Sequence, residues 1–281
     1  MKDEIHQLLD QKVKQYNHIE FIEKDPICIP HLFTKQQDIE IAGFFAAIFA
    51  WGNRTTIINK SKELLQRMDN APFTFCTQHQ DKDLKKLLGF AHRTFNDTDL
   101  LYCIEFFKQH YSKNESLESA FFTTTNTTSS STSLNKKSIE SVNKESLDSK
   151  SKVKTIEKAL TDFQEYFFSL EEAPARTKKH ISSPVSGSTC KRLNMFLRWM
   201  VRKDKQGVDF GIWKKISPAE LIMPIDVHVA RVSRGLGIVK RTQTDWQTAI
   251  ELTDYCRTLD PKDPVKYDFA LFSLGVIEKY N

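Results

Sequence analysis

Apolar residues recur at helical spacing over most of the chain. The strongest pattern covers residues 38–68, and its first half is apolar nearly all round, as in a helix that lies inside a fold. The pair Gly52-Asn53 interrupts this pattern, so we predict two helices there, the second starting at about Thr55. No segment alternates apolar and polar residues in the manner of a strand. The pattern therefore predicts an all-α fold.

Further helices are predicted where the same periodicity returns. The N-terminus has the pattern of a charged amphipathic helix, and residues 97–111 form another whose cap is Asp97 or Thr98. Residues 153–172 and 263–276 complete the set of long helical patterns.

Composition changes abruptly in the middle of the chain. Residues 123–133 are only Thr, Ser and Asn, and polar and charged residues continue to about Lys154. Such a tract cannot bury enough apolar surface to offset the entropy lost on ordering. We therefore predict a disordered insertion over residues 123–153, between an N-terminal helical part (1–122) and a C-terminal part (154–281).

Charge is unevenly spread over the 281 residues, although the formal net charge is only +5. Residues 173–241 hold 15 Lys and Arg against 4 Asp and Glu, a local charge of +11, which leaves −6 for the remainder. This asymmetry indicates a polyanionic partner, nucleic acid before membrane, and a merely solubilising surface is the alternative. The longest apolar run, near residues 41–51, is too short to span a bilayer, so no membrane partner is expected.

The five cysteines are scattered, and none forms a C-x-x-C pair. Neither a zinc site nor an iron–sulfur site is therefore predicted, and we expect no metal and no cofactor. Reduced thiols in a cytoplasmic protein are the simplest interpretation.

Two segments contain charged residues at helix starts that could take part in binding or catalysis. Over residues 182–204 a turn leads into an apolar helix whose first turn holds Lys191, where the helix dipole disfavours a cation. Residues 223–237 read "MPIDVHVARVSRGLG", a helix that Asp226 can cap and that Gly235 and Gly237 can end. A capped helix alone explains this second segment, so any further role of Asp226 depends on the rest of the chain.

In this order the two segments resemble the helix-hairpin-helix DNA glycosylases. "SGSTCKRLNMFL" stands where the family has a hairpin L-P-G-V-G-x-K, and "PIDVHVARVSRGLG" stands where it has its aspartate segment P-V-D-x-H-V-x-R-x-x-x-R-L-G. "FFAAIFAWGNRTTIINKSKELL" resembles the early helix pair, and "DFALFSLGV" resembles the late helix. The whole chain also resembles a bacterial family of unknown function, through "SPVSGSTCKRLNMFLRWMVR" and "DPVKYDFALFSLG".

The chain departs from the glycosylase pattern at two points. Thr189 replaces the second hairpin glycine, which normally lets the backbone approach a phosphate. Lys191 and Asp226 are 35 residues apart, a long spacing that is similar to that of the archaeal oxoguanine glycosylases.

The resemblance implies two helical lobes with a helix-hairpin-helix-like element and a cleft between them. It implies a monomeric base-excision glycosylase acting on duplex DNA, with Asp226 stabilising positive charge on the sugar and Lys191 as a nucleophile that adds lyase activity. The implied DNA contacts are Asn53, Gly187, Ser188, Arg192, Arg198, Arg202, Lys214, Lys215, His228, Arg231 and Arg234. The implied base pocket consists of Trp199, Trp213, Tyr267 and Phe269.

Purely structural roles for these residues, and other functions for the chain, remain as alternatives. Each aromatic residue of the implied pocket could instead belong to the core, and His228 could be a packing histidine. At the level of function, the alternatives are a non-catalytic DNA-binding protein on the same scaffold and a helical protein-interaction domain.

Overall fold

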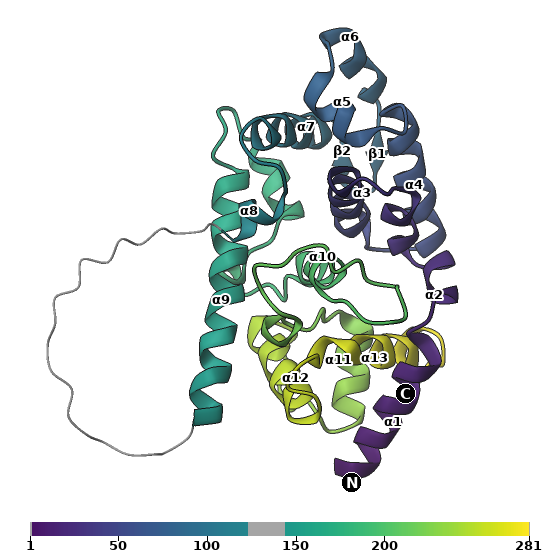
Figure 1. Ribbon diagram of the computed structural model, residues 1–281, viewed down its shortest axis with the longest axis vertical. Coiled ribbons are helices and arrows are strands. Elements are labelled where there is room, and N and C mark those ends of the chain that lie inside the picture. The colour runs from purple at the N-terminus through teal and green to yellow at the C-terminus, as the bar shows by residue number, and fades with distance from the viewer. Residues whose placement is uncertain (1, 123–143, 281) are drawn as a thin grey trace, which may run out of the picture.

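The computed structural model describes residues 2–122 and 144–280, and helices make up most of these residues (Figure 1), which confirms the all-α class. The α-helices are α1 (Lys2–Tyr16), α2 (Glu20–Glu23), α3 (Gln36–Phe49), α4 (Arg54–Arg67), α5 (Pro72–Gln78), α6 (Asp81–Leu84), α7 (Asp97–Tyr111), α8 (Glu118–Phe121), α9 (Lys144–Phe167), α10 (Lys191–Val201), α11 (Val227–Gly235), α12 (Trp246–Leu259) and α13 (Tyr267–Val276). Short 3₁₀ helices connect them: η1 (Pro26–Cys28), η2 (Pro30–Leu32), η3 (Lys85–Leu87), η4 (Ala175–His180), η5 (Pro184–Ser186), η6 (Pro218–Glu220) and η7 (Pro264–Lys266).

A small antiparallel hairpin was not foreseen from the pattern. Its strands, β1 (Ala91–His92) and β2 (Phe95–Asn96), pair His92 with Phe95. Two residues a strand are too few for an alternation of apolar and polar positions to be recognised.

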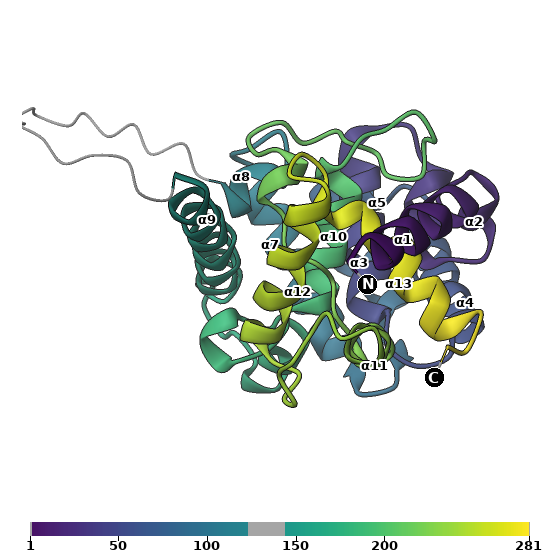
Figure 2. The ribbon, with the colours of Figure 1, turned by 90° about the horizontal axis from the view of Figure 1, so that it is seen from below.

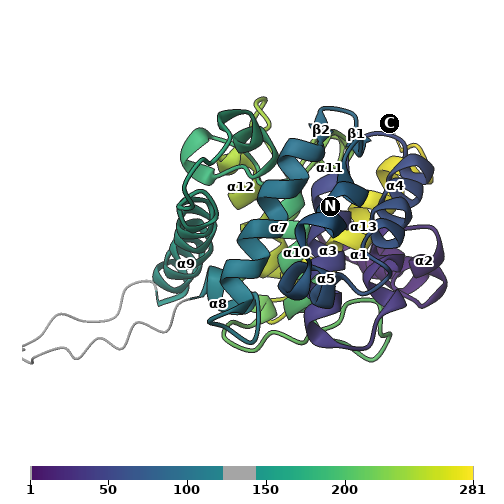
Figure 3. The ribbon, with the colours of Figure 1, turned by 90° about the horizontal axis from the view of Figure 1, so that it is seen from above.

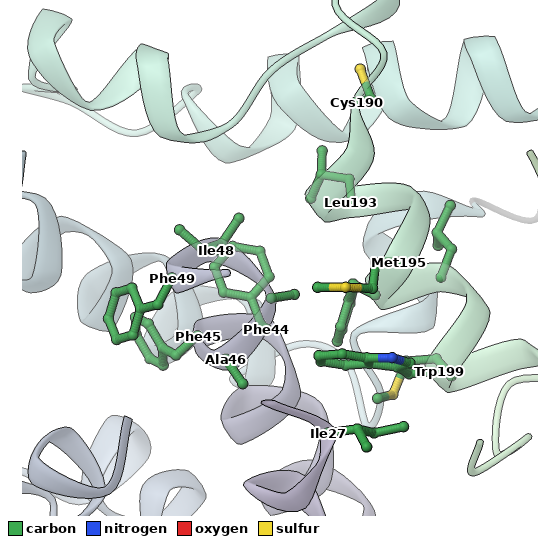
Figure 4. Close-up of a cluster of buried hydrophobic side chains, with 14 of the residues drawn as sticks. Ile27, Phe44, Phe45, Ala46, Ile48, Phe49, Cys190, Leu193, Met195 and Trp199 are labelled. Atoms are coloured by element: carbon green, nitrogen blue, oxygen red, sulfur yellow. The ribbon is translucent and has the colours of Figure 1, made fainter. Parts of the chain in front are cut away.

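Helix α3 lies at the centre of the fold, as its apolar sequence predicts. Figure 3 shows it among α4, α5, α7 and α10, and all its residues from Ile39 to Phe49 are buried. Figure 4 shows Phe44 and Ile48 of α3 beside Leu193 and Trp199 of α10. The two helices come so close that a Cβ at Gly43 would lie 3.0 Å from the methyl group of Met200.

The two ends of the chain close one side of the molecule together. Helix α1 packs along α13 (Figure 2), and Lys12 and the hydroxyl of Tyr16 each donate a 2.6 Å hydrogen bond to Glu278. Helix α13 in turn crosses α11 at Gly275, where a Cβ would lie 3.1 Å from the Cβ of His228. This packing places the start of α11 beside the C-terminal helix.

The predicted insertion lies mostly outside the described residues, which stop at 122 and resume at 144. Helix α9 begins at Lys144 and so includes residues 144–153, the last part of the predicted insertion. Lys, Glu and Leu have high helix propensity, and they extend the amphipathic helix that was expected from residue 153. In the described part of the chain, no helix is both long and apolar enough to cross a bilayer.

Candidate active site

A cleft with a volume of about 730 Å³ opens where three helices begin. Its lining includes Asn53 and Arg54 at the start of α4, Lys191 at the start of α10, and Asp226 and His228 at the start of α11. Helix N-termini carry partial positive charge, so their convergence favours an anionic ligand at the cleft. The remaining walls come from α13, from the residues around η1 and from the start of the loop after α3.

Lys191 and Asp226 thus meet at one cleft, although they open two different helices. The ammonium of Lys191 lies 3.5 Å from the carbonyl oxygen of Ala50, at the end of α3. Helix α10 has no side-chain cap, because its N-cap residue is Cys190 in a left-handed conformation (φ 51°). Lys191 therefore stands in the uncapped first turn of its own helix, as its position in the sequence indicates.

Asp226 caps α11 as predicted. Its Oδ1 accepts hydrogen bonds from the backbone N–H groups of His228 (2.9 Å) and Val229 (3.0 Å). No hydrogen bond to its Oδ2 is formed by a residue in the described ranges 2–122 and 144–280, and the side chain lines the cleft. The cap fixes the carboxylate in place and leaves one oxygen for a ligand.

Two buried carboxylates that sequence reasoning missed also line the cleft. Asp268 of α13 forms an ion pair with Arg198, and burial raises its pKa to about 6 against the opposing effect of the Arg198 and Lys191 charges. Asp25 caps η1 through Oδ1, which accepts from Ile27 N, and burial raises its pKa as well. Asp268 could have been noticed, since it is an acid inside an otherwise apolar helical pattern.

Arg198 and Arg202 are buried and ion-paired; Arg198 still lines the cleft, whereas Arg202 does not, so Arg202 is not placed as a phosphate contact. Arg198 pairs with Asp209 and Asp268, and the guanidinium of Arg202 pairs with Asp204, Asp209 and Asp263. Asp204 and Asp209 lie within residues 173–241, but Asp263 and Asp268 lie 61 and 70 positions beyond their partners, so a charge count over that segment does not include these two acids. The surface of residues 173–241, the basic segment, therefore carries less positive charge than a count of its residues indicates.

Three other predicted arginines are engaged with backbone carbonyls. Arg192 lines the cleft but donates to Ile48 O (2.9 Å) and Lys179 O (3.2 Å), and burial lowers its pKa to about 10. Arg231 donates to Gly275 O at the end of α13, and Arg234 holds the loop before α12 through Arg241 O and Gln243 O. Each of these arginines therefore already uses N–H donors within the protein. A contact with a DNA phosphate would have to use its remaining donors or break these bonds.

The remaining predicted DNA contacts divide between the cleft and other surfaces. Asn53 and the exposed His228 line the cleft, and Oδ1 of Asn53 caps α4 by accepting from Thr56 N (3.1 Å). Lys214 and Lys215 do not line it; their backbone N–H groups donate to Glu118 of α8.

Gly187 and Ser188 belong to the predicted hairpin, which differs from the expected element. The helix before the turn is only the three-residue η5, because Ser183 caps a single turn and Gly187 (φ 76°) ends it. Only α10, the second helix of the element, is an α-helix. The exposed Gly187 and half-buried Ser188 lie outside the cleft lining, whereas Thr189 lies within it.

The predicted base pocket is mostly core. Trp199, Trp213 and Tyr267 are at most 1% exposed and do not line the cleft, which corrects their assignment. Phe269 does line it, where its ring meets that of Phe21 edge to face at 5.2 Å. The cleft draws its other aromatic walls from residues that sequence reasoning did not single out: Phe21, Trp51 and Phe272. A helical pattern shows which residues are apolar, but the neighbouring helices decide which of them remain accessible.

Within residues 2–122 and 144–280, no group of three or more His, Cys, Asp or Glu side chains lies together as a metal site would require. No curated protein and no solved structure matches the chain significantly. One family model matches residues 25–277, and its range contains all the residues of the cleft named above except Phe21. The chain therefore belongs to the family described as protein of unknown function (DUF2400).

Proposed function

We propose that the chain is a DNA glycosylase-like enzyme that uses Lys191 and Asp226 to release a base from duplex DNA. One observation carries the proposal: Lys191 and Asp226, 35 residues apart, line the same cleft. A cleft of about 730 Å³ falls in the range that takes a small-molecule-sized group, and a flipped nucleotide is such a group.

The chemistry assigns each side chain a separate task. The uncharged amine of Lys191 attacks C1′ of the sugar, the glycosidic bond breaks, and its electron pair leaves with the base, which takes up a proton. The C1′–O4′ bond then breaks as Nζ gives up a proton and forms an imine with C1′, and the ring oxygen takes up a proton to become a hydroxyl. Hydrolysis of the imine or strand cleavage by elimination follows. The carboxylate of Asp226 stabilises the positive charge that develops on the sugar.

The surroundings of the pair suit a nucleic-acid strand. The starts of α4, α10 and α11 supply positive potential for phosphates, while Phe21, Phe269 and Phe272 offer apolar ring surface to a base. The two buried acids, Asp25 and Asp268, lie on the same cleft and keep it from being uniformly basic.

Borohydride trapping on a panel of lesion-bearing duplexes tests the proposal. Borohydride reduces the imine to a stable amine, so wild-type protein should give a covalent protein–DNA complex on at least one lesion. Lys191→Gln should give none, while Lys178→Gln, which removes an exposed lysine outside the cleft, should behave as wild type. Excision without trapping would leave Asp226 as the main catalyst and remove the lysine from the mechanism.

Two outcomes would favour other functions. Salt-dependent duplex binding without excision of any base in the panel would indicate the non-catalytic DNA-binding protein, an outcome with which Thr189 in place of the hairpin glycine agrees. Absence of duplex binding at low salt would reject the nucleic-acid proposal and leave the protein-interaction domain.

A further inference from the structure

Arg93 lies over the ring of Trp51, an aromatic wall of the cleft. Its guanidinium is 4.4 Å from the ring centroid of Trp51, and Trp51 lines the cleft. Arg93 is the first residue of the two-residue turn between β1 and β2 and has a positive φ of 56°, a conformation that such turns usually give to Gly or Asn. The hairpin thus holds an exposed arginine in a conformation that costs free energy.

The loop after α3 is shaped to admit this arginine. Gly52, with φ 103°, lies under the guanidinium, and a Cβ at that position would collide with Nη1 of Arg93. The close approach therefore depends on a residue without a side chain.

Arg54, two residues further along, repeats the arrangement. It is the first residue of α4, and its guanidinium lies 5.1 Å from the ring centroid of Phe272 on α13. Both Arg54 and Phe272 line the cleft. Arg54, which follows Asn53, and Arg93, which contacts Gly52, thus each lie over an aromatic ring that lines the cleft.

These two arginines, which we call the rim arginines, differ from the other arginines of the site. Arg192, Arg198, Arg202, Arg231 and Arg234 all donate to carboxylates or carbonyls of the protein. Among the residues that the structure describes, the side chains of Arg54 and Arg93 form no hydrogen bond and no ion pair, although the charge of Arg54 acts on the buried carboxylate of Asp25. Stacking covers one face of each guanidinium and leaves the N–H groups at its edge available.

We propose that the rim arginines, Arg54 and Arg93, bind two backbone phosphates of the DNA strand that enters the cleft. This inference rests on the proposed function, and it assigns the phosphate contacts to residues outside the basic segment 173–241. A guanidinium whose plane is held by an aromatic ring presents a fork of donors to a phosphate and loses little side-chain entropy on binding. The start of α4, where Arg54 lies, adds its dipole to the same ligand.

The experiment uses a duplex with a single tetrahydrofuran residue, an abasic-site analogue that has no base and cannot form an imine. Affinities are measured over a salt series for wild type, Arg54→Gln and Arg93→Asn; Asn is chosen because it tolerates a positive φ. Lys108→Gln, at an exposed lysine of α7 outside the cleft lining, serves as the matched control. Circular dichroism melts verify that every variant is folded.

Each rim variant should lower the affinity about tenfold and reduce the slope of log affinity against log salt by about 0.9, the value for one lost phosphate contact. The control should change neither quantity. Arg93→Lys, which keeps the charge but not the planar fork, should retain the slope and lose part of the affinity.

A second measurement locates the phosphates. Single linkages around the abasic analogue are replaced in turn by uncharged methylphosphonates. Wild type should lose affinity at two particular linkages, Arg54→Gln should be insensitive at one of them, and Arg93→Asn should be insensitive at the other.

The outcomes separate this inference from the function on which it rests. If the rim variants keep the wild-type slope, or stay sensitive to every methylphosphonate, the two proposed phosphate contacts are overturned while DNA binding stands. A wild-type protein that does not bind the duplex overturns both. Binding that depends on the rim arginines, without base excision on any lesion, supports the proposed phosphate contacts and rejects the glycosylase activity.

Discussion

The indole Nε1 of Trp213 donates a 2.7 Å hydrogen bond to Oε1 of Glu40, across 173 positions of sequence. Glu40 is fully buried in α3, and its carboxylate also accepts from the hydroxyl of Tyr111 (2.8 Å), the hydroxyl of Ser116 (2.6 Å) and the backbone N of Leu117 (2.9 Å). The carboxylate therefore ties α3 to α7, to the segment before α8 and to the loop after α10. A buried acid that accepts this many hydrogen bonds needs no cation in contact with it.

Glu40→Gln should destabilise the protein even though the shape of the side chain is preserved. One oxygen becomes an NH₂ group that faces donors, so at least one buried donor loses its acceptor at a cost of roughly 2 kcal/mol. The thermal midpoint should fall by about 4–8 °C for a chain of this size. Glu105→Gln, at an exposed position of α7, is the matched control and should leave the midpoint within about 1 °C. An unchanged midpoint for Glu40→Gln would mean that the donors find other partners.

The substitution Asp226→Asn should distinguish the role of Asp226 as a helix cap from its proposed role in catalysis. The amide oxygen can still accept from His228 N and Val229 N, so the midpoint should stay close to that of wild type. Removing the charge should reduce base excision at least about 100-fold while duplex binding survives. Asp245→Asn provides the control, since Asp245 caps α12 in the same way through Thr248 N (3.0 Å) but does not line the cleft. Equal effects of both substitutions on excision would show that Asp226 acts only as a cap.

Stability should fall as pH rises through the titration of Asp268. Burial raises the pKa of this carboxyl from 3.8 to about 6, so between these values the folded chain keeps a proton that the unfolded chain has released. The free energy of unfolding therefore decreases from about pH 4 to pH 6 by up to about 3 kcal/mol on account of this group.

Denaturant unfolding of wild type and Asp268→Asn at pH 4.5 and pH 7.5 isolates this contribution, because other titrating groups cancel in the difference. The stability of Asp268→Asn relative to wild type should be greater at pH 7.5 than at pH 4.5. A difference that does not change with pH would show that Asp268 titrates at its ordinary value.

Residues 123–143 should be dispensable for folding. Their composition offers little apolar surface to a core, whereas Ile156, Leu160 and Phe163 of α9 are fully buried. Replacing 123–143 with a short Gly-Ser linker should therefore shift the thermal midpoint by less than about 5 °C. A larger fall would mean that the tract contributes contacts to the fold.

Local signals in the sequence predicted much of the helical structure. The break at Gly52-Asn53, the cap at Asp226 and the end of α11 before Gly237 all depend on residues within one or two turns, and the structure confirms them. The cap of α7 shows the limit of this reasoning: Asn96, and not Asp97 or Thr98, accepts from the N–H group of Asp99. Neighbouring polar residues compete for one cap, and the backbone geometry selects among them.

The candidate pair could also be predicted, because Lys191 and Asp226 each stand at a helix start that the sequence makes visible. Its surroundings could not. Arg198 and Arg202 look like surface cations until Asp209, Asp263 and Asp268 are brought to them by the packing of α10 against α13 and the loops beside it. The sequence by itself determined the break between α3 and α4 and the cap of α11, since capping and backbone hydrogen bonds act over about four residues. Only the tertiary structure decided which charges are neutralised inside and which, like Arg54 in the cleft lining and Arg93 over the ring of Trp51, lack a side-chain partner among the described residues, since ion pairing and burial depend on how the helices and loops pack.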